Sequence, residues 1–247
     1  MQMYFQKVGI GQDLILLHGW GMDVSTWWPV VELLKNNLPA GRQGFTLWLL
    51  DLPGFGRSDT PKRAYDTKDY ADIIAEFIKN NKIKNASILG HSFGGKVAIK
   101  LTSTYPNLVN KLILVGSSGI KPVPSFRRML IYPLAKIVHH LVPDIFNLKT
   151  IIRKKFYRKI ESDYENAGAM KDTLLKTIKE DLAEDLKKIK KETLIIWGED
   201  DQTVPLKYGK IMFQLIKNSR LEVLENCGHA PHIKNPYLFT NYVKDFI

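Results

Sequence analysis

The chain of 247 residues has one cysteine and no long apolar run. Because Cys227 has no second cysteine to pair with, no internal disulfide can form, which is typical of a protein in a reducing compartment. No stretch approaches the roughly 18 uninterrupted apolar residues that a membrane-spanning helix needs. The first residues, Met1–Lys7, lack the apolar segment of a secretory signal. We therefore expect a cytoplasmic location and no membrane span.

The sequence also has neither internal repeats nor a low-complexity tail, and its length fits one large core with an insertion. Its formal net charge of +11 is unevenly placed. Ten Lys or Arg residues and a single acid lie between Lys121 and Lys159, a local charge of +9. Such a field can steer an acidic partner or an anionic surface, although a solvated helical face would have the same composition. Nucleic-acid binding is not expected, because no recognisable nucleic-acid module surrounds this stretch.

Short apolar segments recur along the chain and are separated by segments with helical spacing. A continuous apolar run such as Leu14–Leu17 fits a central strand that is buried on both faces. The segments expected to be strands are 4–8, 14–17, 45–50, 86–89, 111–115, 193–197 and 221–224. The chain is therefore expected to be an α/β protein with a mostly parallel sheet.

The segment Gly90–Gly95 joins the strand expected at 86–89 to a segment with helical spacing. The chain must turn sharply at Ser92, and small residues at Gly90 and Gly94 permit the close approach of backbone that such a turn requires. Ser92 then lies exposed at the apex, at the start of a helix. The pattern G-x-S-x-G between a strand and a helix is typical of a nucleophile elbow, so Ser92 is the candidate nucleophile.

The loop His18–Asp23 follows the strand expected at 14–17 and should meet the elbow, because ligands bind beyond the C-terminal ends of parallel strands. Acyl transfer needs two backbone N–H groups directed at the developing oxyanion. We expect Phe93, the residue after the candidate nucleophile, and Trp20 to provide them.

Two polar residues near this region resemble general bases but have structural interpretations. His18 is expected to brace its loop by hydrogen bonds. Asp51 precedes Pro53 and Gly54, so we expect it to brace the turn that these residues mark.

An acid and a base follow two later strands. Glu199-Asp200-Asp201 comes after the strand at 193–197, and His229 comes after the strand at 221–224. A serine hydroxyl needs a base to take its proton, and a histidine keeps the right tautomer when a carboxylate accepts its other N–H. The order Ser, Asp, His along the chain therefore predicts a catalytic triad.

The alternation of strands stops between about Ile120 and Lys190. Prolines divide a segment that is otherwise helical in propensity. A long helical insertion between strands is typical of a cap that closes over an active site. We expect residues 1–119 and 191–247 to form the core and residues 120–190 to form this helical cap.

Taken together, these motifs resemble the α/β-hydrolase superfamily along nearly the whole chain. The segments that carry the resemblance are His18–Gly21, Asp51–Ser58, Gly90–Gly94, Trp197–Asp201 and Gly228–His229. The resemblance implies a mostly parallel central sheet of about eight strands flanked by helices. In members with the W-G-x-x-D pattern the triad acid is the final Asp, here Asp201, with Asp200 as the alternative. The family's base follows the glycine directly, which favours His229 over His232.

The resemblance implies neither a cofactor nor a metal. Relatives that are haloalkane dehalogenases or epoxide hydrolases have Asp at the elbow apex, so Ser92 argues against both activities. The implied cycle is attack by Ser92, an oxyanion held by the N–H groups of Phe93 and Trp20, an acyl-enzyme, and water activated by His229.

The leading hypothesis is a serine carboxylesterase that acts on a small-molecule ester with a small or medium acyl group; a lactone, a thioester or a carbon–carbon bond are alternatives. The chain also resembles the esterase of biotin synthesis that cleaves a methyl ester on acyl carrier protein, and the basic cap segment would suit that acidic carrier. However, His91 and Phe93 stand where that family typically has Trp and Leu. A non-catalytic binding protein with the same fold is the remaining alternative.

Overall fold

The computed structural model describes residues 1–36, 44–121 and 167–247. The chain divides into two compact units, the first made of Met1–Ile120 with Ala169–Ile247 and the second of Lys121–Gly168. The second unit lies almost wholly outside the described residues, as do most of the predicted cap and nearly all of the basic segment between Lys121 and Lys159. The cap boundaries at 120 and 190 therefore stay a prediction.

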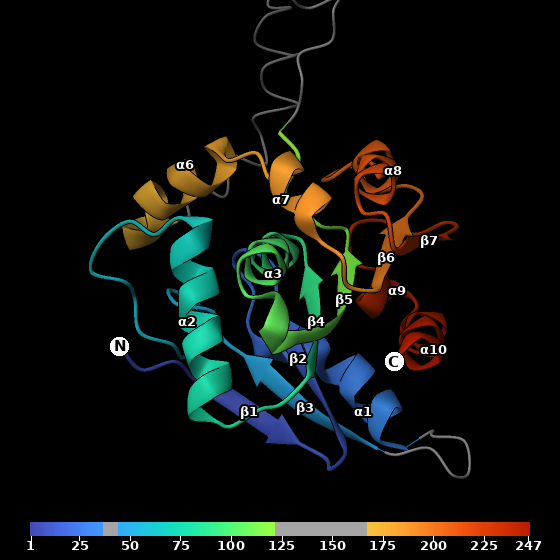
Figure 1. Cartoon of the computed structure of the whole chain (residues 1–247), viewed down its shortest axis with the longest axis horizontal. Coiled ribbons are helices and arrows are strands. Elements are labelled where there is room, and N and C mark those ends of the chain that lie inside the picture. Colours follow the sequence, from blue (N-terminus) through green and yellow to red (C-terminus); the bar gives the residue numbers. More distant parts are fainter. Residues whose placement is uncertain (37–43, 122–166) are drawn as a thin grey trace, which may run out of the picture. The chain divides into compact units, whose positions relative to one another are not determined.

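The first unit is built on a seven-stranded sheet, which confirms the predicted fold class (Figure 1). Its strands are β1 (Phe5–Val8), β2 (Gln12–Leu17), β3 (Phe45–Leu50), β4 (Ala86–His91), β5 (Val109–Val115), β6 (Thr193–Gly198) and β7 (Ser219–Leu224). Their order in the sheet is β1-β3-β2-β4-β5-β6-β7, and only β1 is antiparallel to its neighbour.

The predicted strands are all present, and several are longer than their apolar segments. Backbone pairing continues past the apolar residues because ladder hydrogen bonds do not depend on the side chain. At the start of β2, Gln12 pairs with Phe45, and at the end of β4, His91 pairs with Val115. The second extension brings β4 directly to Ser92.

Helices cover both faces of the sheet. Figure 1 shows α1, α9 and α10 on one face and α2, α3, α7 and α8 on the other. The helices described are α1 (Trp28–Asn36), α2 (Thr67–Asn80), α3 (Phe93–Thr104), α6 (Lys171–Lys179), α7 (Ala183–Lys188), α8 (Leu206–Leu215), α9 (Pro231–Lys234) and α10 (Pro236–Phe246). None of them is long and apolar enough to cross a membrane.

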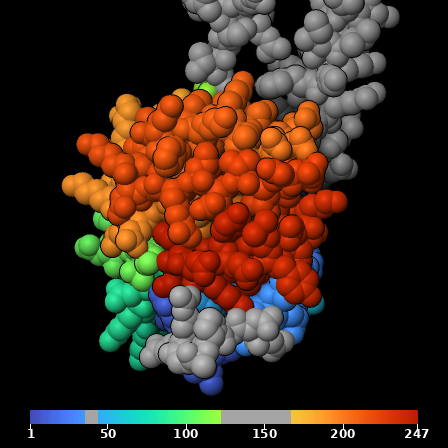
Figure 2. Space-filling model, turned by 90° about the vertical axis from the view of Figure 1, so that its right-hand side faces the viewer, coloured from blue at the N-terminus to red at the C-terminus, as the bar shows by residue number. Residues whose placement is uncertain are grey.

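The core lies between the sheet and these helix layers. Alternate residues of a strand point to opposite faces, so Leu14 and Leu16 pack with α1 and α10 in one apolar cluster. Ile15 and Leu17 between them are equally buried. The continuous apolar run of β2 is thus explained by cover on both faces. Figure 2 shows the side of the molecule where β7 and α8–α10 lie.

A buried ion pair ties α3 to the segment after α6. Lys96 is almost fully buried, and its Nζ lies 3.7 Å from the Glu180 carboxylate. The same ammonium donates to the backbone carbonyls of Thr177 and Glu180. The Glu180 carboxylate also accepts the N–H and hydroxyl of Thr67 at the start of α2. Burial lowers the pKa of Lys96, and Glu180 opposes that shift.

Glu180→Ala should destabilise the protein, because it leaves the buried Lys96 ammonium without its counter-charge. We expect a loss of about 2 kcal/mol in the free energy of unfolding, measured by urea titration. Removal of one partner from a fully buried ion pair costs more, about 3–5 kcal/mol. The effect is smaller because Glu180 is 24% exposed and Lys96 keeps two carbonyl partners. The control is Glu184→Ala, which removes an exposed pair with Lys187 and should cost less than about 1 kcal/mol. Equal losses for the two variants would contradict this role of Glu180.

Candidate active site

Ser92 lies at the apex of a tight turn between β4 and α3. Its backbone has φ +52° and ψ −111°, a conformation that L-residues adopt at a cost of about 1–3 kcal/mol. A Cβ on Gly90 would lie 2.4 Å from the carbonyl oxygen of Gly94, and one on Gly94 would lie 2.2 Å from that of Leu17. The two glycines are therefore required by close backbone contacts, as the sequence analysis expected.

Backbone hydrogen bonds hold this turn in the sheet. The N–H of Ser92 donates to the carbonyl of Val115 at 2.9 Å, which continues the pairing of β4 with β5. The carbonyl of Ser92 accepts the N–H of Ser118 at 3.1 Å and its hydroxyl at 3.2 Å. The strained residue is thus fixed from both sides, and its side chain is left partly exposed.

Three side chains from separate loops form a continuous hydrogen-bonded series. The Ser92 hydroxyl donates to Nε2 of His229 at 3.0 Å. Nδ1–H of His229 donates to Oδ2 of Asp201 at 2.7 Å. The structure therefore brings together the three residues that the sequence analysis selected as nucleophile, base and acid.

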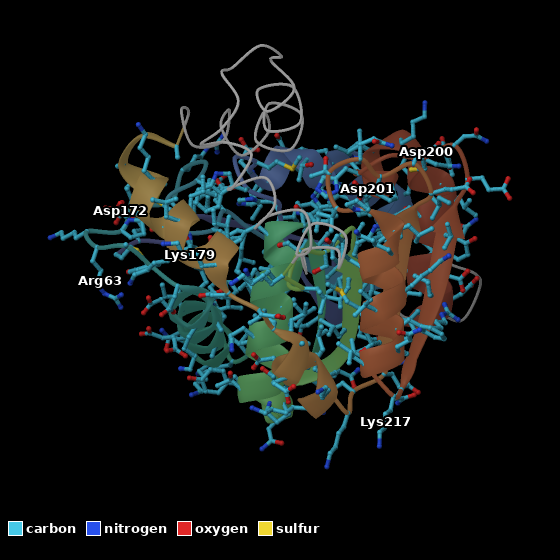
Figure 3. All side chains as sticks on the ribbon, turned by 90° about the horizontal axis from the view of Figure 1, so that it is seen from above. Arg63, Asp172, Lys179, Asp200, Asp201 and Lys217 are labelled. Atoms are coloured by element: carbon cyan, nitrogen blue, oxygen red, sulfur yellow. The ribbon has the colours of Figure 1, made fainter. Side chains whose placement is uncertain are left out.

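The second oxygen of Asp201 is held by its own loop. Oδ1 accepts the N–H groups of Thr203 and Val204, both at 2.8 Å. Asp201 is 4% exposed, whereas its neighbour Asp200 is exposed (Figure 3). Of the two carboxylates left open by the sequence, Asp201 is the one that contacts His229.

His232, the alternative base, is buried and forms no hydrogen bond with Ser92 among the interactions of the described residues. Its Nε2 lies 3.4 Å from Oγ1 of Thr26, and its ring packs on that of Trp27. Burial holds the pKa of His232 well below its usual value, so the ring is neutral. His232 is thus a core residue beside the series and not a member of it.

The residues expected to stabilise an oxyanion lie next to each other. Phe93 is the first residue of α3, so its N–H has no partner within the helix. Trp20, in the loop after β2, packs its ring edge-on against that of Phe93, with centroids 5.2 Å apart. Phe55 packs against both rings. An apolar aromatic group, Trp20, Phe55 and Phe93, therefore adjoins Ser92.

His18 braces its loop, as expected. Nδ1–H of His18 donates to the carbonyl of Gly19 at 2.8 Å, and Nε2 accepts the N–H of Leu52 at 2.9 Å. Burial lowers the pKa of this histidine, which is fully enclosed and therefore neutral. Because both ring nitrogens are occupied, His18 connects the loop after β2 to the loop after β3.

Asp51 braces the turn after β3, as expected from its position before Pro53 and Gly54. Its Oδ1 accepts the N–H of Val24 at 2.7 Å, and its Oδ2 accepts the N–H of Arg57 at 2.9 Å. The residue is 1% exposed. Its carboxylate thereby satisfies two backbone donors that the loops would otherwise leave without partners.

No role was expected from the sequence for His91, the residue before Ser92. The structure buries it completely and places its Nε2 2.9 Å from the carbonyl oxygen of His229. No local signal in the sequence indicates this burial, because it results from contacts with loops that are distant along the chain.

A cysteine nucleophile and a metal centre are two other possible sources of reactivity in this region. Burial raises the pKa of the Cys227 thiol, which makes it a poor nucleophile. Within residues 1–36, 44–121 and 167–247, no group of three or more His, Cys, Asp or Glu is arranged to hold a metal ion. Ser92, His229 and Asp201 are instead joined by hydrogen bonds between their side chains.

Comparisons with known proteins place these residues in a wider context. A sequence model described as the alpha/beta hydrolase family matches residues 14–239. A 2-hydroxy-6-oxononadienedioate/2-hydroxy-6-oxononatrienedioate hydrolase of Pseudomonas putida is 29% identical over 270 residues, covering 100% of this chain and 92% of the relative. A pimeloyl-(acyl-carrier protein) methyl ester esterase of Wigglesworthia glossinidia brevipalpis is also 29% identical, with 99% and 97% covered.

Among solved structures, an esterase from Exiguobacterium antarcticum superposes with a TM-score of 0.74. It is 24% identical, and the match covers 99% of this chain and 94% of that one. At this identity the likeness concerns the fold alone.

Asp51→Ala should destabilise the protein strongly, because it leaves the buried N–H of Val24 and the partly buried N–H of Arg57 without their acceptors. We expect a loss of about 2–4 kcal/mol in the free energy of unfolding, measured by urea titration. The control is Asp59→Ala in the same loop, which removes one exposed bond to the N–H of Gln2 and should cost less than about 1 kcal/mol. A loss for Asp51→Ala no larger than that of the control would exclude the bracing role.

Proposed function

Because the chain belongs to the alpha/beta hydrolase family, we propose that it is a serine hydrolase that cleaves carboxylic esters of small to medium acyl groups. The observation that carries this proposal is the series of hydrogen bonds from Asp201 through His229 to Ser92. A serine hydroxyl in this arrangement can lose its proton to the imidazole as it attacks a carbonyl carbon.

In the proposed cycle, Ser92 Oγ bonds to the ester carbonyl carbon while its proton passes to Nε2 of His229. Asp201 then stabilises the imidazolium through its bond to Nδ1–H. The oxyanion accepts hydrogen bonds from the N–H groups of Phe93 and Trp20. When the tetrahedral intermediate collapses, His229 gives its proton to the leaving alcohol and an acyl-Ser92 ester remains.

In the second half of the cycle a water molecule replaces the alcohol. His229 takes a proton from the water as it attacks the acyl-enzyme, and a second tetrahedral intermediate forms in the same oxyanion site. Its collapse returns the proton to Ser92 and releases the carboxylic acid. The described residues of the cycle need no cofactor for these steps.

An ester with an apolar part suits the surroundings of Ser92. Trp20 and Phe55 are partly exposed, and their rings pack against that of Phe93 at the start of α3. Aromatic rings of this kind bind apolar groups by burial of surface. The similarity to the methyl ester esterase of Wigglesworthia supports an ester as the substrate.

A second candidate activity is hydrolysis of a carbon–carbon bond in a keto acid. The observation that favours it is the 29% identity, over the whole chain, to the Pseudomonas putida hydrolase whose name specifies a 2-hydroxy-6-oxo diacid. Hydrolysis of such a ketone must break a carbon–carbon bond, and a serine, an oxyanion site and a base are suited to it as well. Lactones and thioesters are further acyl substrates for the same groups.

The substrate could also be attached to an acidic carrier protein. The name of the Wigglesworthia relative includes such a carrier, and the basic segment from Lys121 to Lys159 has the complementary charge. That segment lies outside the described residues, so the sequence alone supports this partner. A cytoplasmic location agrees with such a role.

Hydrolysis of p-nitrophenyl esters from acetate to dodecanoate should depend on Ser92 and be fastest for short or medium chains. Ser92→Ala should lower kcat by about 10³-fold or more, because the nucleophile is removed. Cys227→Ala is the control, since it removes the other potential nucleophile and should leave kcat within about 3-fold. Turnover that survives in folded Ser92→Ala would reject the serine mechanism. Labelling of Ser92 by a fluorophosphonate without ester turnover, combined with cleavage of a 2-hydroxy-6-oxo dienoate, would favour the second candidate activity.

Asp201→Asn and Asp200→Asn form a matched pair of neighbouring variants. Asp201→Asn should lower kcat for the best ester by about 10³–10⁴-fold, because the amide no longer stabilises the imidazolium of His229. Asp200→Asn makes the same replacement of a carboxylate by an amide, but at an exposed side chain, and should leave kcat within about 3-fold. A larger loss of kcat for Asp200→Asn than for Asp201→Asn would show that Asp201 is not the acid of the triad.

A further inference from the structure

The residue before the proposed nucleophile holds the proposed base. His91 is the last residue of β4 and is 0% exposed. Its Nε2 lies 2.9 Å from the backbone carbonyl oxygen of His229, and the two imidazole rings have centroids 4.9 Å apart. One side chain thus connects the nucleophile elbow to the loop that carries His229.

The protonation of His91 follows from its partners. A carbonyl oxygen only accepts hydrogen bonds, so Nε2 of His91 must carry the proton and donate it. Burial lowers the pKa of His91 to about 3, which keeps the ring neutral. Its Nδ1 is then a bare acceptor, and it has no hydrogen-bond partner among the described residues.

A buried acceptor without a partner costs free energy that an apolar side chain would not. The ring packs directly against the backbone, because a Cβ on Gly19 would lie 3.0 Å from Nδ1. A leucine could fill this space without a buried polar atom. What histidine adds at position 91 is a donor, Nε2–H, that reaches the carbonyl of His229.

The loop before α9 is held at two carbonyls, two residues apart. The carbonyl of Cys227 accepts the N–H of Asp200 at 2.9 Å, from the loop of the proposed acid. The carbonyl of His229 accepts Nε2–H of His91, from the elbow. The backbone that carries the base is therefore fixed between the loops of the acid and of the nucleophile.

We propose that His91 is a positioning residue, which fixes the backbone of His229 so that its imidazole stays within hydrogen-bonding distance of both Ser92 and Asp201. This inference rests on the proposed function, in which Ser92 is the nucleophile and His229 its base. Among the described residues, His91 forms no hydrogen bond with the Ser92 hydroxyl or the His229 imidazole, and its hydrogen bond is to the main chain of His229.

His232 provides a matched control for this proposal. It is also a histidine, is also 0% exposed, and its ring centroid lies 4.6 Å from that of His91. Its Nδ1 also lacks a hydrogen-bond partner among the described residues. Unlike His91, it has no hydrogen bond to His229 or Ser92 in the described part of the chain. A loss of packing alone should affect the two positions alike.

The test measures how fast a fluorophosphonate inactivates the full chain, because this probe reports the reactivity of Ser92 without knowledge of the substrate. His91→Leu should lower the second-order inactivation rate at least about 10-fold, and His232→Leu should leave it within about 3-fold. His91→Gln should retain the rate within about 3-fold, because its amide nitrogen can take the place of Nε2–H. With a p-nitrophenyl ester, the loss in His91→Leu should fall on kcat, with KM changed by less than about 3-fold.

His91→Asn gives a second comparison where the leucine variant does not fold. Its amide is one methylene shorter than that of glutamine and cannot reach the carbonyl of His229, so its rate should fall as in His91→Leu. Equal rates for His91→Gln and His91→Asn, or a wild-type rate in folded His91→Leu, would overturn the positioning role. A wild-type protein that the probe does not label would instead reject the proposed function. The two failures are thus distinguishable.

Discussion

Ser92 holds a left-handed backbone conformation at the end of a central parallel strand, and the surrounding sequence is constrained by it. The turn brings α3 so close to β4 and to the end of β2 that positions 90 and 94 have no room for a side chain. It also needs a neighbouring strand to fix it, which β5 provides through Val115. The strained conformation of Ser92 therefore requires both buried strands and both glycines. Its cost of about 1–3 kcal/mol must be offset by the packing of the sheet.

The fold and the position of the proposed site could be predicted because both depend on features that are local in sequence. Parallel strands covered on both faces consist of continuous apolar runs, and the turn at Ser92 requires glycines at fixed spacing. The choice between Asp200 and Asp201 is not local, since it depends on which carboxylate faces a loop that is 28 residues away. The resemblance to a family selected Asp201, whereas composition and spacing left both residues open. The limits of strands were underestimated wherever a polar residue such as Gln12 or His91 continued the ladder.

The role of His91 was beyond the sequence for a related reason. A histidine after an apolar strand has the composition of a residue entering solvent, and nothing local indicates that it is enclosed. Its burial results from the meeting of three segments: the elbow, the loop of Gly19 and the loop of His229. His18 and Asp51 were easier to predict because each lies in a turn whose own backbone donors and acceptors it satisfies. The contrast is between side chains that serve a local turn and one that connects distant loops.

The residues around Ser92 also bear on which bond is cleaved in the substrate. The proposed nucleophile, base and backbone N–H donors suit any reaction that passes through a tetrahedral oxyanion at a carbonyl. Hydrolysis of an ester and of a carbon–carbon bond beside a ketone both do so, and the relatives of this chain include names of both kinds. The two reactions differ in the leaving group, which is an alkoxide for an ester and a carbanion for the ketone. They therefore differ in the residues that must surround the leaving group. On the described side, that surrounding is the aromatic group Trp20, Phe55 and Phe93, which offers apolar surface and no charge. An apolar ester requires apolar surface of this kind, whereas a diacid also requires cations to balance its two carboxylates, so the two candidate substrates differ in the charge that the rest of the site must provide.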